Sequence, residues 1–225
     1  MPDMQNQYTE SHSPKKVVVI GAGGFGREVA WLIERINNVA PTWQLLGFVD
    51  DDESKFLRKF HGLPVLGNID WLNRQSDDLF VVCSVGKSII RKTIVSRIRG
   101  KRFATLIDPD VICSDSVNIG EGSIICAGSI LTVDISIGSH TIINLDCTVG
   151  HDAVISDFVT VYPSVNISGN VCIESCVEIG TGSQIIQVLH IAENTIIGAG
   201  AVVIRDLPSN CTAVGSPAKP IKFSI

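Results

Sequence analysis

A histidine followed by an aspartate, His151 and Asp152, is the pair in this 225-residue chain whose types suit acid–base chemistry. The pair stands in the stretch CTVGHDAVISDF, directly after a glycine and within a region rich in Val and Ile. Imidazole has an ordinary pKa of about 6.5, so it can accept a proton near neutral pH. A neighbouring carboxylate can hold the other ring nitrogen and fix the tautomer. A lone turn histidine is more often a solvated surface residue, so the surrounding pattern has to decide.

A glycine-rich loop is the second feature whose spacing indicates chemistry. GAGGFG, residues 21–26, matches GxGxxG, follows an apolar run and precedes an amphipathic segment. Glycines there let the backbone approach a phosphate at a helix N-terminus. Asp50 ends the next apolar run, where a dinucleotide-binding fold has its ribose-binding acid. The loop therefore predicts a nucleotide site, with an NAD site and a purely structural turn as the alternatives.

The elements around this loop alternate between strand and helix over residues 15–104. The stretches KKVVVIGAG, QLLGFVDDD and LFVVCSVG are predicted strands, and REVAWLIERIN and SIIRKTIVSRIRG are predicted helices. This order, with short connections, predicts a small Rossmann-like parallel sheet with helices packed on it. The region is closer to half a doubly wound fold than to a full one, which counts against NAD.

The period changes to six residues from 105 to 206, which contains seventeen units without an insertion. From residue 117 on, the third position of every unit is Ile, Leu or Val, and the last three positions are rich in Gly, Asp, Asn and Ser. Helical periodicity cannot keep this phase, whereas a short strand followed by a turn can. The repeat predicts a parallel β-helix over 105–206, flanked by a flexible tail (1–14) and a C-terminal tail (207–225).

This phase places His151 fifth in its unit, on a corner of the β-helix with its side chain pointing outward. Residues eighteen apart stack, so Gly169 lies beside His151 and leaves, we expect, a gap for an extended ligand along the corners. Cys147 is first in its unit and is predicted to point inward. The histidine therefore has no nucleophilic side chain beside it in its column.

Composition and charge exclude several classes of function. The formal net charge is −5 without a Lys/Arg run, so neither nucleic acid nor an anionic membrane is an expected partner. The chain starts with a polar segment and lacks a long apolar run, which predicts a cytoplasmic protein without a membrane span. Seven cysteines without CxxC pairs indicate reduced, mostly buried thiols. Cys172 and Cys176 lack further ligands, so no metal is expected.

These stretches resemble a known family. The hexapeptide repeat resembles the left-handed β-helix of hexapeptide acyltransferases, and the tail LPSNCTAVGSPAKPIKF resembles their "VxGxPAK" ending. NLDCTVGHDAVISDF is similar to the motif of the PglD-like nucleotide-sugar N-acetyltransferases of the bacillosamine pathway and of the NeuD-like sialic acid O-acetyltransferases. The resemblance implies a left-handed coil of three units per turn and a homotrimer with active sites between subunits.

The resemblance also implies an activity. It is the acetyl-CoA-dependent N-acetylation of a nucleotide-linked amino sugar, with UDP-4-amino-4,6-dideoxy-N-acetylglucosamine as the expected substrate. His151 would be the general base, Asp152 would orient it, and the amine would attack acetyl-CoA directly. One alternative is O-acetylation of a sialic acid or a similar sugar. An alternative of another class is an NAD-binding or scaffold protein.

The family's binding residues map onto several positions of this chain. For the nucleotide sugar these are Gly23, Gly24, Phe25, Asp50, Asp51 and Gly86, with Lys87 and Arg91 adding positive charge for the diphosphate. For acetyl-CoA they are Thr160, Gly169, Thr181, Ala199 and Lys219. Asn144 is expected to contribute across a subunit boundary. Many relatives carry a second histidine where this chain has Thr160, whose hydroxyl can donate one hydrogen bond to the thioester but cannot titrate.

Overall fold

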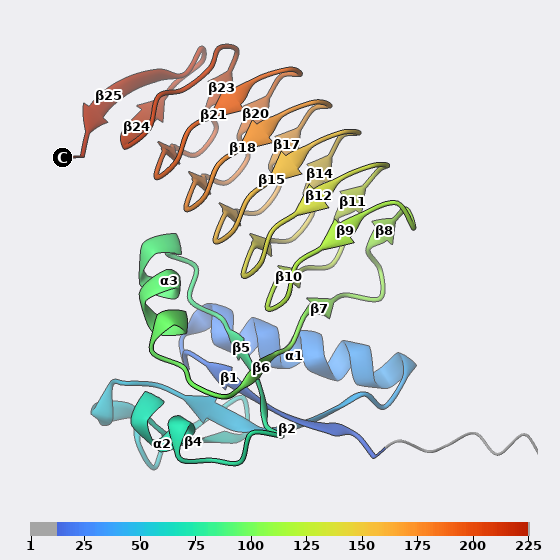
Figure 1. Cartoon of the computed structure of the whole chain (residues 1–225), viewed down its shortest axis with the longest axis vertical. Helices are drawn as coiled ribbons and strands as arrows, with labels where there is room; N and C mark the ends of the chain where they lie inside the picture. Colours follow the sequence, from blue (N-terminus) through green and yellow to red (C-terminus); the bar gives the residue numbers. More distant parts are fainter. Residues whose placement is uncertain (1–12, 225) are drawn as a thin grey trace, which may run out of the picture.

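The computed structural model describes residues 13–224, which form an α/β sheet followed by a left-handed, three-sided β-helix (Figure 1). The predicted fold class is confirmed. Most of the predicted N-terminal tail, residues 1–12, lies outside the described residues. Among residues 13–224, no helix has the length and apolar character needed to cross a membrane.

The first part is a six-stranded sheet in the order β3-β4-β2-β1-β5-β6. Its parallel strands are β1 (Lys15–Ile20), β2 (Trp43–Val49), β4 (Leu63–Gly67), β5 (Phe80–Cys83) and β6 (Arg102–Phe103), and β3 (Lys59–Phe60) runs antiparallel to β4. Its helices are α1 (Gly24–Val39), α2 (Ile69–Asn73) and α3 (Ser88–Ser96), with a 3-10 turn at Glu53–Lys55.

The central strand β1 shows why this sequence forms a two-sided sheet. Val17 and Val19 pack with residues of α1 on one face, whereas Val18 and Ile20 pack with Leu72 and other residues on the opposite face. These four side chains are buried, as a parallel strand covered on both sides requires.

The β-helix consists of short strands that recur every six residues and form three faces. Face I contains β7 (Leu106–Ile107), β10 (Ile124–Ile125), β13 (Ile142–Ile143), β16 (Thr160–Val161), β19 (Glu178–Ile179), β22 (Ile196–Ile197) and β24 (Cys211–Val214), which pairs antiparallel with β25 (Lys219–Phe223). Face II contains β8 (Ile112–Cys113), β11 (Ile130–Leu131), β14 (Thr148–Val149), β17 (Asn166–Ile167), β20 (Gln184–Ile185) and β23 (Val202–Val203). Face III contains β9 (Asn118–Ile119), β12 (Ser136–Ile137), β15 (Val154–Ile155), β18 (Cys172–Ile173) and β21 (His190–Ile191).

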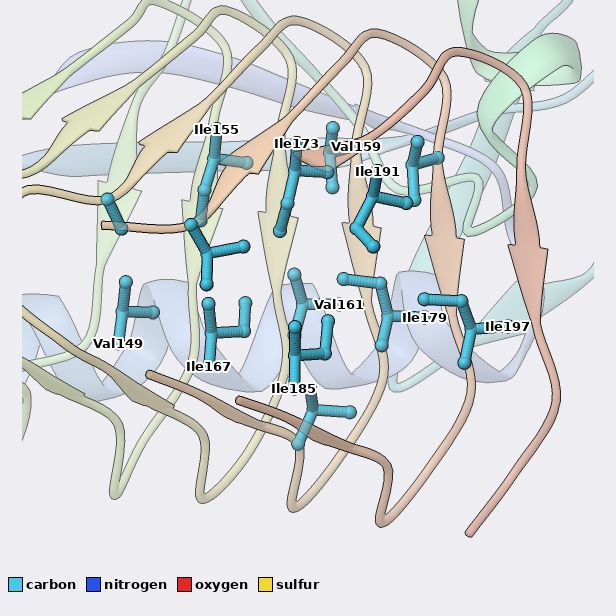
Figure 2. Packing of buried hydrophobic residues seen from close by; sticks show 14 of the residues in the cluster. Val149, Ile155, Val159, Val161, Ile167, Ile173, Ile179, Ile185, Ile191 and Ile197 are labelled. Carbon is cyan, nitrogen blue, oxygen red and sulfur yellow. The ribbon is translucent and has the colours of Figure 1, made fainter. Parts of the chain in front are cut away.

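The third residue of each six points into the prism, as predicted. Strands pair with the strand eighteen residues further on, for example Ile142 with Thr160. Aliphatic side chains therefore stack in columns such as Val149, Ile167 and Ile185 (Figure 2), each at most 2% exposed. Non-glycine corner residues adopt a positive φ at six-residue intervals, from Asp134 to Cys176, which turns the chain between faces. Cys147 is fully buried, as predicted.

The α/β sheet covers face I of the prism. Leu106, Ile124 and Ile142 of face I belong to the same hydrophobic cluster as Val29 and Ile33 of α1. Arg35 of α1 holds the first coil by donating from Nε and Nη2 to the two carboxylate oxygens of Asp108, at 2.6 and 3.0 Å. The two parts are thus joined by an apolar surface and a bidentate ion pair.

A buried histidine, His140, lies at the vertex between faces III and I. Its ring stacks on Phe158 and meets Phe103 of the sheet edge-on, with ring centroids 5.0 and 4.5 Å apart. Its Nδ1 is buried and has no hydrogen-bond partner within residues 13–224. Burial, reinforced by the charge of Arg91, lowers the pKa of His140 from 6.5 to about 4.

His140 is therefore expected to make the fold sensitive to acid. The unfolded chain binds this proton at about pH 6.5 and the folded chain only at about pH 4, so the stability contributed by the neutral ring is lost as pH falls between these values. We expect His140→Phe, which keeps the aromatic stack, to lose less stability than the native chain between pH 7 and pH 4.5. Urea midpoints at the two pH values measure this, and equal losses in both proteins would contradict it.

Candidate active site

His151 lies on the vertex between faces II and III, where β14 turns into β15. Its side chain is 59% exposed, and Nδ1 is 2.7 Å from Oδ2 of Asp152. Asp152 has a φ of 59°, the left-handed corner conformation. Because an ionised carboxylate only accepts, Nδ1 carries a proton in this pair, and in the neutral imidazole Nε2 is then the nitrogen with the free lone pair. The geometry is that of a solvent-facing base oriented by an acid.

The space beside Gly169 differs from the predicted one. A Cβ built on Gly169 would lie 2.5 Å from Nε2 and 2.6 Å from Cε1 of His151. The space above this glycine is therefore filled by the imidazole itself, and the expectation of an open gap there was wrong. Gly169 is needed because any side chain would displace the ring of the base.

A hollow of about 130 Å³ lies at the carboxyl ends of β1, β2 and β5. It is lined by Ile20, Gly21, Val49, Asp50, Asp51, Ile69, Val85 and Ile94. Open parallel sheets bind ligands at this edge. In the glycine loop, a Cβ on Gly26 would overlap the carbonyl oxygen of Gly21, whereas Gly23 and Gly24 have nothing within 4 Å of a built Cβ. Gly26 is thus needed for packing, and the other two leave the backbone open to a ligand.

The two acids at the end of β2 are already engaged. Asp50 accepts from the amide of Ala22 at 2.8 Å and from Nζ of Lys55 at 2.8 Å, so it closes the glycine loop. Burial raises the pKa of Asp50, but the hydrogen bonds from Lys55, Ala22 and Asp52 outweigh burial and leave the pKa below its ordinary value. Asp51 accepts from the amide of Ile69 and from Arg97.

The sequence alone did not identify Lys55 and Arg97 as partners of these two acids. They lie five and forty-six residues away from them. The sequence offers one indication of these pairings, the positive charge of Lys55 and Arg97, and many other surface residues carry the same charge.

Two predicted ligand contacts are wrong. Arg91 was expected to face a diphosphate, yet it is 0% exposed and its guanidinium donates only to backbone carbonyls. Thr160 was expected to face the thioester, yet it is 1% exposed and its hydroxyl donates to the carbonyl of Gly86 at 2.6 Å. Both side chains lie between face I and the loop after β5, so neither is free to meet a ligand.

The remaining predicted residues lie in different environments. Lys87, Thr181, Ala199 and Lys219 are exposed. Phe25 is half-buried and packs against the cluster that contains α1. Asn144 is 8% exposed, and its Oδ1 accepts from the amide of Leu145 at 2.8 Å.

One chain does not bring the predicted site residues together. Gly86 rests on Thr160 of face I, whereas His151 lies on the vertex between faces II and III, which is opposite face I in a three-sided prism. Asn144, Thr181 and Ala199 lie on the vertex between faces I and II. The base, the glycine loop and the other predicted acetyl-CoA contacts are therefore distributed around the prism.

The described residues contain no group of three or more His, Cys, Asp or Glu that could hold a metal. All seven cysteines are free thiols. Burial raises the pKa of Cys147 to about 11, so this thiol, close to His151 in sequence, is neither exposed nor ionised near neutral pH.

A nucleotide-type crevice on a small α/β sheet, joined to a hexapeptide β-helix with a carboxylate-held histidine on a vertex, defines a class of hexapeptide-repeat transferase. Residues 16–98 match the family model of the PglD N-terminal domain. GDP-perosamine N-acetyltransferase of Escherichia coli is 31% identical over 215 residues, with 92% of this chain and 96% of the relative covered. The chain therefore belongs to the PglD-like sugar acetyltransferase family.

Solved structures agree with this assignment over the whole fold. The acetyltransferase domain of PglB from Neisseria gonorrhoeae, in complex with acetyl coenzyme A, superposes with a TM-score of 0.83 at 32% identity, covering 92% of this chain and 100% of that domain. A histidine-to-asparagine variant of perosamine N-acetyltransferase from Caulobacter crescentus, in complex with CoA and GDP-perosamine, gives a TM-score of 0.82 at 30% identity, covering 92% and 97%.

Proposed function

We propose that this protein transfers the acetyl group of acetyl-CoA to the amino group of a nucleotide-linked amino sugar. The observation that carries the proposal is the exposed imidazole of His151, whose Nδ1 is held by Asp152 at 2.7 Å and whose ring faces solvent. The family assignment supports the same reaction, because the relatives are N-acetyltransferases of an amino sugar.

The proposed mechanism is a direct attack. The neutral amine adds to the thioester carbonyl, and Nε2 of His151 takes the proton that the nitrogen must lose. Asp152 stabilises the imidazolium that forms. Collapse of the tetrahedral intermediate breaks the C–S bond, and the imidazolium returns the proton to the leaving thiolate. The products are the amide and free CoA. Direct attack involves no acyl-enzyme, and the buried thiol of Cys147 is not accessible to form one.

The nucleotide is proposed to bind at the hollow beside the glycine loop. The open backbone at Gly23 and Gly24 offers amides to the diphosphate at the N-terminus of α1. Exposed Lys87 can add a positive charge beside it. Asp51, which is half-exposed and lines the hollow, can accept hydrogen bonds from the nucleoside.

The active site is proposed to form between subunits of a homotrimer. Within one chain the glycine loop and His151 are on opposite sides of the prism, so the vertex of a second copy has to bring a base to the bound sugar. Thr181, Ala199 and Lys219 are then candidate contacts that a neighbouring chain offers to acetyl-CoA, and Asn144 is a candidate contribution to the site across the subunit boundary.

The substrate is tested by measuring CoA release with a panel of acceptors. The two candidate amino sugars are UDP-4-amino-4,6-dideoxy-N-acetylglucosamine, implied by the sequence motif, and GDP-perosamine, which names the relatives. We expect turnover with an amino sugar and none with its hydroxyl counterpart. Turnover only with a hydroxy sugar would mean O-acetylation. Binding of NAD without any acetyl transfer would refute the proposal.

A further inference from the structure

The loop that joins β5 to α3, residues 84–87, contributes Val85 to the proposed nucleotide site. Val85 lines the hollow together with Gly21 and Asp50. The same loop lies against face I of the β-helix, so it is the point where the nucleotide site and the prism touch. The side chains that hold this loop therefore also determine the position of a bound nucleotide relative to the β-helix, which carries His151.

Arg91 of α3 holds the loop against the prism, and all five N–H groups of its guanidinium donate hydrogen bonds. Its Nη1 donates to the carbonyls of Val85 and Gly86 at 2.7 and 2.9 Å. Its Nε donates to the carbonyl of His140 at 2.8 Å, and its Nη2 donates to those of Phe158 and Val159 at 2.8 and 3.1 Å. A guanidinium has five N–H groups, and here each has one acceptor. One planar group thus connects the loop to two successive corners of the prism.

Arg91 keeps its positive charge in this buried position. Burial lowers its pKa to about 10, which still leaves it protonated at neutral pH. A buried charge is costly unless its donors are satisfied, and five carbonyl oxygens satisfy them here. The planar shape of the guanidinium matters here. A lysine ammonium has only three N–H donors and cannot contact the carbonyls of the loop and those of the prism corners together.

Two side chains of face I, those of Thr160 and Glu178, hold the same loop and the first residue of α3. Thr160 donates to the carbonyl of Gly86, which therefore accepts from Thr160 and Arg91 together. Glu178, the next residue of the face I column, accepts from the amide of Ser88 at 2.9 Å and from its hydroxyl at 2.8 Å. The carboxylate of Glu178 thus accepts the hydrogen bond of the first amide of α3, so this amide is not free to bind a phosphate.

We infer that Arg91, Thr160 and Glu178 form a loop anchor that positions the nucleotide-binding loop on the prism for acetyl transfer. The inference rests on the proposed function of the hollow as the nucleotide site. The three side chains act through the loop and touch no reacting atom, so they are positioning residues. Misplacing a substrate by about 1 Å can lower the rate by about a hundredfold, which makes such an anchor consequential.

Thr160→Val tests the anchor with the smallest structural change. It removes one hydrogen bond to the Gly86 carbonyl and keeps the β-branched shape. We expect nucleotide affinity, titrated with UDP and with GDP, and the KM for the nucleotide sugar to weaken about fivefold to tenfold, because one such bond stabilises the held position of the loop by about that factor. The KM for acetyl-CoA should stay unchanged. Thr160→Ser, which restores the hydroxyl, should behave as the native chain.

Thr195→Val is the matched control. Thr195 is also buried on the prism, and its hydroxyl donates to a single carbonyl, that of Pro208, at 2.7 Å. The carbonyl of Thr195 accepts from the amide of Glu178, but its side chain has no hydrogen bond to the loop or to an anchor side chain. The variant should therefore lose comparable stability and no nucleotide affinity. If Thr160→Val binds nucleotide as tightly as Thr195→Val, or if its KM for acetyl-CoA rises equally, the loop anchor is wrong.

Arg91→Lys extends the test, and we expect the same pattern with a loss of at least about tenfold. The readouts separate this inference from the proposed function. A native protein that acetylates no amino sugar refutes the function, whereas the nucleotide titrations of the variants still decide the anchor. A native protein that is active, with a Thr160→Val variant that binds nucleotide normally, refutes the anchor alone.

Discussion

His151→Ala should lower kcat by at least about a hundredfold, the usual contribution of a general base. The side chain is 59% exposed and fills no core position, so its removal should leave the prism folded. The KM values for both substrates should change little, because the imidazole acts on the proton of the attacking amine rather than on the bound ground state. Steady-state rates of CoA release with an amino-sugar acceptor measure the effect.

A second histidine provides a close control for this experiment. His190 on face III is 46% exposed, and its Nε2 lies 2.8 Å from Oε1 of Glu174, so it is also an exposed imidazole held by a carboxylate. It lies on β21, away from the vertex that carries His151. His190→Ala should keep native turnover. Equal rates for the two alanine variants would remove His151 from the mechanism.

Gly169→Ala should abolish most of the activity without unfolding the protein. The new Cβ would lie 2.5 Å from Nε2 of His151, closer than real Cβ contacts, so the ring must swing away. The backbone of Gly169 is outside the left-handed region, so alanine itself is tolerated there. We expect kcat to fall at least about tenfold, because a displaced base no longer reaches the amine, with little change in thermal midpoint.

The effect of Gly169→Ala should disappear when the imidazole is absent. In a double-mutant cycle, Gly169→Ala added to His151→Ala should cost almost nothing further, because the two changes act on the same interaction. Additive losses in the cycle would mean that Gly169 acts through something other than the ring. They would then favour the earlier expectation that Gly169 contacts acetyl-CoA directly.

The β-helix could be read from the sequence because its order is local. A six-residue period in which Ile, Leu or Val recurs at the third place follows from the alternation of side chains in a short strand, whatever the rest of the chain does. The same phase placed His151 on a corner and Cys147 inside, as the structure has them. The pairing of His151 with Asp152 was accessible for the same reason, since the two are neighbours in sequence.

The α/β sheet was predicted less completely. The three central strands and the helices α1 and α3 carry long apolar patterns, and they were recognised. The outer strands β3, β4 and β6 and the short helix α2 were not, because elements of two to five residues are defined by the partners beside them more than by their own sequence.

Sequence patterns therefore determined that an α/β sheet precedes a parallel β-helix, and the six-residue period determined the outward direction of His151 and the stacking of Gly169 beside it. The left hand of the β-helix was implied by the family resemblance. Only the tertiary structure decided that the imidazole lies over Gly169, and that Arg91 and Thr160 hold a loop rather than a ligand. The physical reason is that a repeat specifies which side of a strand a residue occupies, but not what covers that side. On face I the cover is the α/β domain: its loop after β5 supplies the carbonyl that Thr160 binds, and its helix α3 supplies Arg91, which lies outside the repeat and connects this loop to the prism.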